Sequence, residues 1–343
     1  MNTLFSQWYA NTRIITAVVM SVVVLSACMS TSEPIMASKV ASWQTVKTQG
    51  KLQNRHEAGL VALGDKLYLL GGRGKKNVNV YDVNSNTWSI KSKMPMQMHH
   101  FQPVVFNEKI YILGAMTGGY PREDAVPNVW IYDPSLDSWQ KSHAIPENRR
   151  RGGAGVSVYK NKIYLTSGIT DGHYTGSVTW FDEYDPVTGQ WRVLKDALKP
   201  RDHFQTAVIG NKLYAAGGRT TSAKTKQVFN LVVKQVDVYD FETETWSALN
   251  LDLPTGRAGH SVFALDHRLI VVGGESNQRI AHADVEVYNT LVGQWYTGAS
   301  LERGRHGTGI GQIADQLWTV SGSGNRGGRP ELPSTESIKV SDI

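Results

Sequence analysis

Six short apolar runs recur along the chain, and each is rich in the branched and aromatic residues that favour β-strands. Each run ends in two glycines or a degenerate version of the pair, which lets the backbone turn sharply and pack closely against a neighbour. The runs are 67–70, 110–113, 163–165, 213–216, 269–272 and 317–320, and they end in Gly71-Gly72, Gly114-Ala115, Ser167-Gly168, Gly217-Gly218, Gly273-Gly274 and Ser321-Gly322. The pattern predicts six copies of one β-rich unit.

A tyrosine and a tryptophan seven residues apart follow each of the first five runs. The pairs are Tyr81 and Trp88, Tyr132 and Trp139, Tyr184 and Trp191, Tyr239 and Trp246, and Tyr288 and Trp295, with successive tryptophans 51, 52, 55 and 49 residues apart. A period of about 50 residues with paired glycines resembles the kelch repeat, in which each repeat forms one four-stranded propeller blade. The resemblance covers residues 40–343 and implies an all-β fold, a six-bladed kelch β-propeller in one domain.

The sixth unit lacks its final part. Ser341-Asp342 take the place of the Tyr-Asp pair there, and no tryptophan follows them. Ser42-Trp43, near the other end of the chain, matches the missing piece in local sequence. We therefore expect strand 42–48 to complete the last blade and close the ring, because an unsealed propeller would expose two open sheet edges.

The first residues have the composition of an export signal. Arg13 is the only charged residue among residues 1–27, and it precedes an apolar run, 14–25, that is too short to span a bilayer. The run ends in Leu25-Ser26-Ala27-Cys28, which resembles the lipobox of bacterial lipoproteins. The resemblance implies a signal peptide over 1–27, acylation of Cys28 (with palmitate, for example) and a tether over 28–39. We expect the protein to be lipid-anchored in the bacterial envelope, at the outer membrane, on its periplasmic or surface face.

Composition removes several classes of chemistry. Cys28 is the only cysteine, so no intrachain disulfide and no cysteine-based zinc or iron–sulfur site can form. Galactose oxidase, another kelch protein, needs a cysteine crosslinked to a tyrosine, and the expected acylation of Cys28 excludes its copper-radical chemistry here. The sequence has neither a His-Glu-x-x-His motif nor an EF-hand loop, and we expect no metal and no cofactor. The net charge of +6 is spread over every repeat, which argues against nucleic acid as a partner.

The repeat places an arginine just before the first strand of five blades. These are Arg55, Arg151, Arg201, Arg257 and Arg305, with Met98 in blade two. We predict that the five guanidiniums gather around one mouth of the central channel, joined by Arg73 and Arg219 from neighbouring loops and by His306. Arginine suits bidentate recognition of carboxylate, phosphate or sulfate. The alternative is that each arginine pairs with an acid of the next blade.

Histidines and tyrosines near the same mouth supply candidate catalytic groups. They are His100, Tyr120, His173, Tyr174 and His203. The chain is similar in fold and compartment to bacterial periplasmic kelch proteins such as the sialic-acid mutarotase family. We favour a monomeric binding module for an anionic ligand, either an acidic sugar or glycan or an acidic protein segment. Two alternatives stay open: a carbohydrate-active enzyme, namely a mutarotase/epimerase or a uronate polysaccharide lyase, and a protein-interaction scaffold of the envelope.

Overall fold

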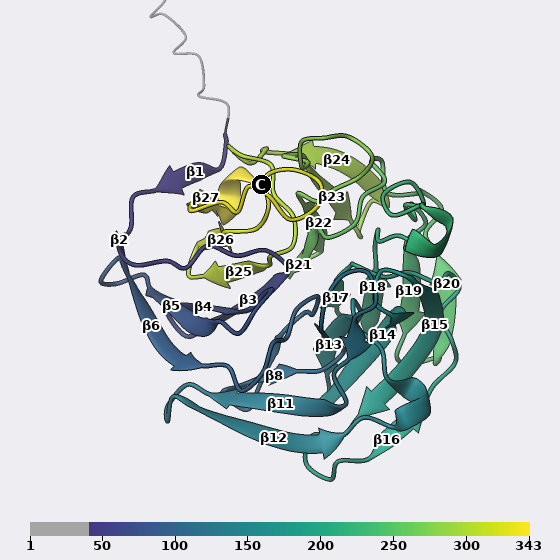
Figure 1. Cartoon of the computed structure of the whole chain (residues 1–343). Helices are drawn as coiled ribbons and strands as arrows, with labels where there is room; N and C mark the ends of the chain where they lie inside the picture. The colour runs from purple at the N-terminus through teal and green to yellow at the C-terminus, as the bar shows by residue number, and fades with distance from the viewer. Residues whose placement is uncertain (1–40) are drawn as a thin grey trace, which may run out of the picture. The chain divides into compact units, whose positions relative to one another are not determined.

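A computed structural model describes residues 41–343, which form six antiparallel sheets arranged in a ring (Figure 1). Every blade places its strands side by side as a simple meander, so each pairs with the next strand of its repeat. The predicted six-bladed kelch propeller is thereby confirmed. Cys28 and the predicted signal peptide and tether lie outside the described residues.

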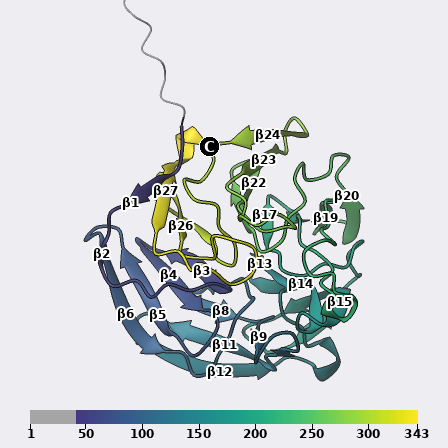
Figure 2. The same ribbon diagram turned by 45° about the horizontal axis from the view of Figure 1, so that its top comes forward.

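The first three blades follow one another along the chain. Blade one consists of β3 (Ala58–Leu63), β4 (Lys66–Gly71), β5 (Asn77–Asp82) and β6 (Thr87–Lys93); blade two of β7 (Val104–Phe106), β8 (Lys109–Ile112), β11 (Asn128–Asp133) and β12 (Ser138–Ala144); and blade three of β13 (Gly155–Tyr159), β14 (Lys162–Asp171), β15 (Thr175–Tyr184) and β16 (Trp191–Val193). The pair β9 (Met116–Thr117) and β10 (Asp124–Ala125) lies beside β14, on one face of the ring (Figure 2).

The other three blades complete the circle. Blade four consists of β17 (Thr206–Ile209), β18 (Lys212–Ala215), β19 (Asp237–Asp240) and β20 (Thr245–Ala248); blade five of β21 (Ser261–Leu265), β22 (Arg268–Val272), β23 (Val285–Asn289) and β24 (Gln294–Gly298); and blade six of β25 (Ile310–Ile313), β26 (Gln316–Val320), β27 (Thr335–Lys339) and β1 (Gln44–Val46). Residues 41–343 also contain three short 3-10 helices: η1 (Glu147–Arg149) and η2 (Ala223–Thr225) in connections, and η3 (Val340–Asp342) after the last strand.

The N-terminal strand closes the ring, as predicted. Strand β1 pairs antiparallel with β27, with Gln44 opposite Ser337. The following β2 (Gln49–Gly50) pairs with β6 of blade one, so one segment joins the last blade to the first. Trp43 is fully buried in the core of blades five and six.

The strand register explains the spacing of tyrosine and tryptophan. In each of the first five blades the two residues stand opposite each other across the hairpin between the third and fourth strands, as Tyr81 and Trp88 do. Their ring centroids are 5.2 Å apart in that blade. In blade six Ile338 pairs with Leu317 and so takes the tyrosine position. The expectation that Ser341 takes it is wrong, because no downstream tryptophan fixed the alignment there.

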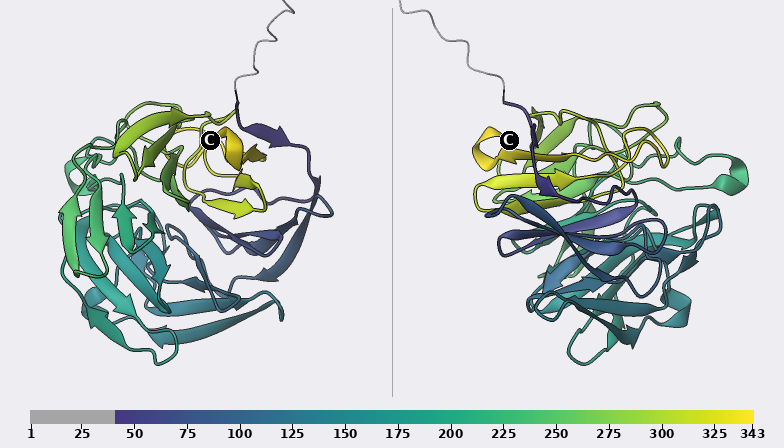
Figure 3. Two further views of the ribbon diagram at one scale, coloured as in Figure 1. Left: turned by 180° about the vertical axis from the view of Figure 1, so that it is seen from behind. Right: turned by 60° about the vertical axis from the view of Figure 1, so that its left-hand side comes forward.

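The apolar core lies between neighbouring blades rather than at the centre of the ring. Tyr68 and Val80 of blade one pack with Ile110 and Ile112 of blade two, and equivalent clusters occur around the circle. Figure 3 shows the long loop of blade four, which carries η2, projecting from one face. Among residues 41–343, no helix has the length and apolarity needed to cross a membrane.

Candidate functional site

A closed circle of backbone hydrogen bonds surrounds the central channel. It joins the residue just before the first strand of each blade to its counterpart in the next. The six positions are Glu57, His100, Gly153, His203, Gly259 and Gly307, with N···O distances of 2.5 to 3.1 Å; Ala58 N–H closes the circle on the Gly307 carbonyl. This circle fixes the positions of the side chains that it carries.

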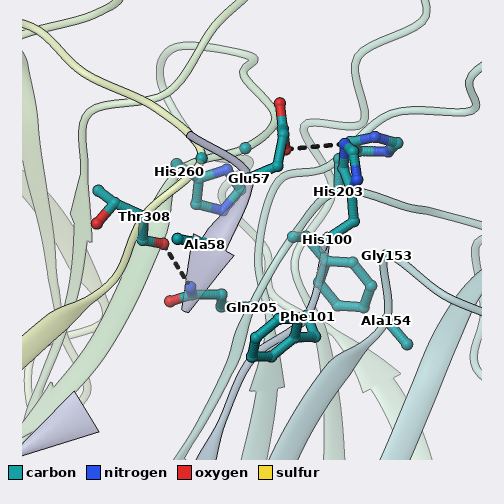
Figure 4. Close-up of a pocket in the computed structure, with 13 residues that line it drawn as sticks. Glu57, Ala58, His100, Phe101, Gly153, Ala154, His203, Gln205, His260 and Thr308 are labelled. Atoms are coloured by element: carbon teal, nitrogen blue, oxygen red, sulfur yellow. Dashed lines mark hydrogen bonds and ion pairs between the residues drawn. The ribbon is translucent and has the colours of Figure 1, made fainter. Parts of the chain in front are cut away.

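All six positions have left-handed backbone, with φ between 54° and 64°. Three blades place glycine there, which accepts this conformation without cost. The other three place Glu57, His100 and His203, for which the same conformation costs roughly 1 to 2 kcal/mol. Residues held in such strained backbone cluster at functional sites. Figure 4 shows Glu57, His100 and His203 together at the channel.

His173 joins His100 and His203 to form a buried cluster. It comes from the hairpin between β14 and β15, and its Nε2 lies 2.9 Å from the Nε2 of His203. The ring of His100 stands edge-on to both, with centroid distances of 4.9 Å to His173 and 4.6 Å to His203. Burial, reinforced by the charge of Arg219 and only partly opposed by Asp202, lowers the pKa of His203. Burial holds the pKa of His100 well below its usual value.

Each of these histidines touches a carboxylate. Glu123 lies 3.0 Å from His173 Nδ1, Asp202 lies 2.5 Å from His203 Nδ1, and Glu57 lies 2.8 Å from His100 Nε2. Burial alone would raise the pKa of these acids, but hydrogen bonds and charges from the histidines outweigh it. The pKa of Asp202 falls to about 2, and those of Glu57 and Glu123 also lie below their ordinary values.

A cavity of about 710 Å³ opens above this cluster, and His173 and Glu57 belong to its wall. Arg73, Arg219 and Tyr120 line it as well, so these three predicted mouth residues and His173 are brought together. The guanidinium of Arg73 bonds to Glu123 at 2.7 Å, and that of Arg219 to Glu275 at 2.5 Å. A smaller cavity of about 40 Å³ shares Glu57 and is lined by His100 and His203 (Figure 4).

The five repeated arginines do not line this mouth, and this part of the prediction is wrong. Arg55, Arg151, Arg201, Arg257 and Arg305 are each at most 2% exposed. Each guanidinium lies inside its own blade and donates to the carbonyl of the first residue of the glycine pair, as Arg201 does to Gly217 at 3.0 Å. They act as clasps between the strands of a blade.

The partner of each clasp is a side chain on the third strand of the same blade. The pairs are Arg151 with Asp182, Arg201 with Asp237, Arg257 with Glu286 and Arg305 with Glu336, while Arg55 bonds to Asn79. Acids therefore compensate four of the five arginines, but each acid belongs to the same blade and not, as the alternative had expected, to the next. The guanidinium suits the position because it supplies several N–H donors to the carbonyl oxygens that converge there, as Arg201 does to those of Ala215, Gly217 and Gln235.

Two further predicted residues sit beside the cavity without lining it. His306 is buried, and its Nε2 lies 2.8 and 2.7 Å from the carbonyl oxygens of Asn325 and Gly327, so it holds the 325–327 loop. Tyr174 is covered by the guanidinium of Arg122, 3.5 Å from its ring centroid. Neither side chain reaches the cavity wall in the described structure.

Sequence reasoning missed Glu123, Lys76, Phe229 and Arg329. Lys76, Phe229 and Arg329 belong to the cavity wall, whereas Glu123 supports Arg73 and His173 from behind it. Glu123 follows Tyr120 in the loop between β9 and β10. Tyr120 was selected because its loop follows a degenerate glycine pair and reaches the mouth, and the same reasoning applies to Glu123. Phe229 lies in the long loop of blade four, whose backbone N–H groups at Ala223 and Lys224 donate to the carbonyls of His173 and Tyr174.

Comparisons with known proteins agree with this architecture. The family model described as Attractin/LZTR1 beta-propeller matches residues 35–301. Kelch-like protein terF of Aspergillus terreus is 27% identical over 320 residues, covering 88% of this chain and 68% of that protein. Alpha-scruin of Limulus polyphemus is 30% identical over 174 residues, covering 48% of this chain and 19% of scruin. Human Kelch-like protein 38 is 24% identical over 224 residues, covering 64% of this chain and 36% of that protein.

This chain therefore spans about two thirds of terF and a much smaller part of the other two relatives. Among solved structures, one titled "Structure of YjhT" superposes with a TM-score of 0.70 at 16% sequence identity. The superposition covers 82% of this chain and 94% of that one. At this level of identity the likeness shows a shared fold.

Proposed function

The chain belongs to the Attractin/LZTR1 β-propeller family and is a kelch-type propeller, and on that premise we propose that it is a binding module whose mouth cavity takes an acidic sugar or an acidic residue of a glycan. The cavity of about 710 Å³ has room for one or two sugar rings. The proposed ligand contacts the residues that line this cavity and not the five clasp arginines, which are buried inside their blades.

The observation that carries the proposal is the charge of the cavity wall. Within residues 41–343, Lys76 and Arg329 line the cavity and have no ion-pair partner. The acids on the wall each lie within ion-pair distance of a basic side chain; they are Glu57, Glu275 and Glu331. Arg73 adds a third cation, 27% exposed, which stays available on the side away from Glu123. Two unpaired cations beside a partly exposed guanidinium favour a ligand that carries a carboxylate.

Aromatic side chains on the same wall favour a sugar over an acidic protein segment. Tyr120 is 58% exposed, which is unusual for so large a ring, and it lies over His173 with a centroid distance of 5.2 Å. Phe229 also lines the cavity, but it is only partly exposed, and the guanidiniums of Arg219 and Arg326 lie over its ring, 5.3 and 5.6 Å from the centroid. The exposed ring of Tyr120 beside hydrogen-bonding groups matches the apolar face and hydroxyl edge of a pyranose.

A glycan array tests this assignment. The full chain is expected to retain sialylated and uronate-containing glycans and to leave their neutral counterparts unbound. The Tyr120→Ala variant is expected to lose most of the signal, because it removes the stacking face without changing charge. Retention of neutral glycans alone would contradict the proposal, and no retention at all would favour a protein-interaction scaffold.

A second candidate is an enzyme on the same class of sugar, a mutarotase/epimerase or a uronate lyase. His173 and Tyr120, two of the predicted catalytic candidates, both face the cavity and touch each other. Polarimetry on sialic acid and ultraviolet detection of an unsaturated uronate product test the two reactions. Loss of either signal in Tyr120→Phe, with binding retained, would assign the hydroxyl a role in the reaction.

For localisation we propose a lipid anchor on Cys28, supported by the Leu25-Ser26-Ala27-Cys28 sequence. The test is fractionation of cells that express the full chain, followed by mass spectrometry of the N-terminal peptide. The wild-type chain should partition with membranes and carry acyl chains on Cys28, and the Cys28→Ser variant should lose both properties. An unmodified Cys28 would refute the anchor.

A further inference from the structure

Three histidines from three different blades converge below the mouth cavity. The nitrogen atoms that His100, His173 and His203 offer lie within 4.8 Å of one another, and all three side chains are buried. No sequence motif could have revealed this group, because its members are separated by 30 residues or more and meet only when blades two, three and four pack together. A purely structural role does not explain why the Nε2 atoms of His173 and His203 face each other in this group.

The relevant feature is the contact between His173 and His203. The Nδ1 atom of each ring lies within hydrogen-bond distance of a carboxylate, Glu123 at 3.0 Å and Asp202 at 2.5 Å. A carboxylate accepts, so each Nδ1 carries the hydrogen, and in the neutral rings each Nε2 presents a lone pair. These two Nε2 atoms face each other at 2.9 Å. Two lone pairs at this distance repel, so a positive group is needed between them.

The surroundings have the arrangement found behind metal-binding histidines. A ligating histidine usually donates its other N–H to a carboxylate that fixes its tautomer and orientation. Asp202 is itself held by the hydroxyl of Thr221 at 2.5 Å and the Thr221 N–H at 2.9 Å. Glu123 is held by Arg73 at 2.7 Å and by the N–H of His173 at 2.9 Å. Both orienting acids are therefore fixed before any ligand arrives.

His100 supplies the third imidazole. Its Nε2 is buried and lies 2.8 Å from Glu57 Oε2, yet makes no hydrogen bond of acceptable geometry. The ring is edge-on to the other two, and the backbone of His100 is fixed by the hydrogen-bonded circle around the channel. A third buried imidazole, in contact with Glu57, is therefore held beside the two opposed lone pairs.

The local charge has the sign and size that a divalent cation would balance. Glu57, Glu123 and Asp202 contact the three rings, and among residues 41–343 Arg73 is the one guanidinium bonded to any of these acids. With neutral histidines, three carboxylates and one guanidinium leave two negative charges. Arg219, the next cation, is bonded to Glu275 instead.

We propose that His100, His173 and His203 bind a divalent transition metal of the zinc class, with the remaining coordination position directed toward the mouth cavity. Imidazole ligands suit zinc, copper, nickel and iron, and three protein ligands with one open position are typical of reactive zinc sites. Tetrahedral zinc with Zn–N bonds of about 2.0–2.1 Å needs nitrogens roughly 3.3 Å apart. The His173–His203 pair therefore opens slightly and His100 turns inward. A metal there would act as a Lewis acid toward a ligand oxygen.

The test uses zinc alone on the full chain, without any sugar, so its outcome does not depend on the proposed ligand. Equilibrium dialysis against a zinc buffer, followed by metal analysis, should give one equivalent per chain. Replacement of zinc by cobalt(II) should give the strong visible absorption of a tetrahedral site. The variants are His100→Gly and His203→Gly, because three other blades carry glycine at the same position and backbone conformation.

Each variant should bind zinc at least roughly tenfold more weakly. The His282→Gln variant is the matched control, because His282 is a buried histidine of blade five that bonds to Ser276. It should bind like the wild type. Zinc should also raise the melting temperature of the wild type and the control, but not of His203→Gly. Absence of stoichiometric zinc in the wild type, or equal binding by all four proteins, would overturn the proposal and leave a shared proton as the group between the two rings.

Discussion

The guanidinium of Arg201 lies 3.1 Å from the carboxylate of Asp237, and neither side chain is exposed to solvent. Arg201 also donates to the carbonyls of Ala215, Gly217 and Gln235, so it ties the second strand of blade four to the connection that leads to the third. Four of the five clasps contain such a buried ion pair. The arginine recurs in five of the six blades, and in each of them it ties the strands of the blade together.

Removing one partner of this clasp should destabilise the propeller strongly. Asp237→Asn leaves the Arg201 charge buried without its counterion, which typically costs about 3–5 kcal/mol. Chemical denaturation of the variant should show this loss in the free energy of unfolding. The exposed pair Arg192 and Glu244 serves as the control, and Glu244→Gln should cost at most about 1 kcal/mol. Equal small losses in both variants would contradict the clasp.

Ring closure should depend on Trp43. Trp43→Ala removes a fully buried ring from the core shared by blades five and six, where it packs with Leu317 and Ile338. A cavity of this kind typically costs about 3–5 kcal/mol. Deleting residues 41–48 should lower the melting temperature further and in one cooperative transition, because the strand completes the last blade. A truncated chain that melted like the parent would show that the ring does not need the strand.

Acid should weaken the fold partly through His260. Burial is the main cause that lowers the pKa of His260 to about 3, the charges of Arg257, Arg201 and His282 lower it further, and the hydrogen bond to the Ala216 carbonyl opposes them. A histidine with a depressed pKa stabilises the fold fully above its unfolded pKa of about 6.5, and this contribution is lost as the pH falls toward 3. The free energy of unfolding should therefore decrease over this window.

His260→Gln keeps a donor for the Ala216 carbonyl but does not titrate. Its stability should fall less steeply below pH 6.5 than that of the wild type, by up to about 1.4 kcal/mol per pH unit, the value for one proton. Parallel stability curves for the two proteins would show that His260 is protonated as readily in the folded chain as in the unfolded one.

The repeat itself could be predicted from sequence because its main features are local. Tyr81 and Trp88 are separated by one hairpin, so their spacing reports directly on strand register. The missing tryptophan of blade six could likewise be found at Trp43, because the count of repeats demanded it. Blade six has no such aromatic pair, and there the predicted alignment was displaced by three residues, with Ser341 expected at the position that Ile338 takes.

The site was predicted less well, because its members meet across blades. The repeat predicts an arginine at the position of Arg201, but not that its side chain points into the blade. That direction is set by Asp237, which follows a long loop of irregular length. His100, His173 and His203 could be named as candidates, yet their contact depends on the left-handed backbone of His100 and His203 and on the circle of hydrogen bonds that holds these two residues. Neither the left-handed backbone nor the hydrogen-bonded circle produces a residue spacing that can be recognised in a single sequence.

The most direct test of the proposed binding function is a calorimetric titration of the full chain with the acidic sugar that the array selects. Lys76 and Arg329 should supply much of the affinity, since they line the cavity without ion-pair partners in the described part of the chain. The double variant Lys76→Ala/Arg329→Ala should bind at least tenfold more weakly, as expected when charge-assisted hydrogen bonds of about 1.5–3 kcal/mol are lost. Arg192→Ala, which removes an exposed arginine of strand β16, should bind like the wild type. Unchanged affinity in the double variant would contradict an anion site in the mouth cavity.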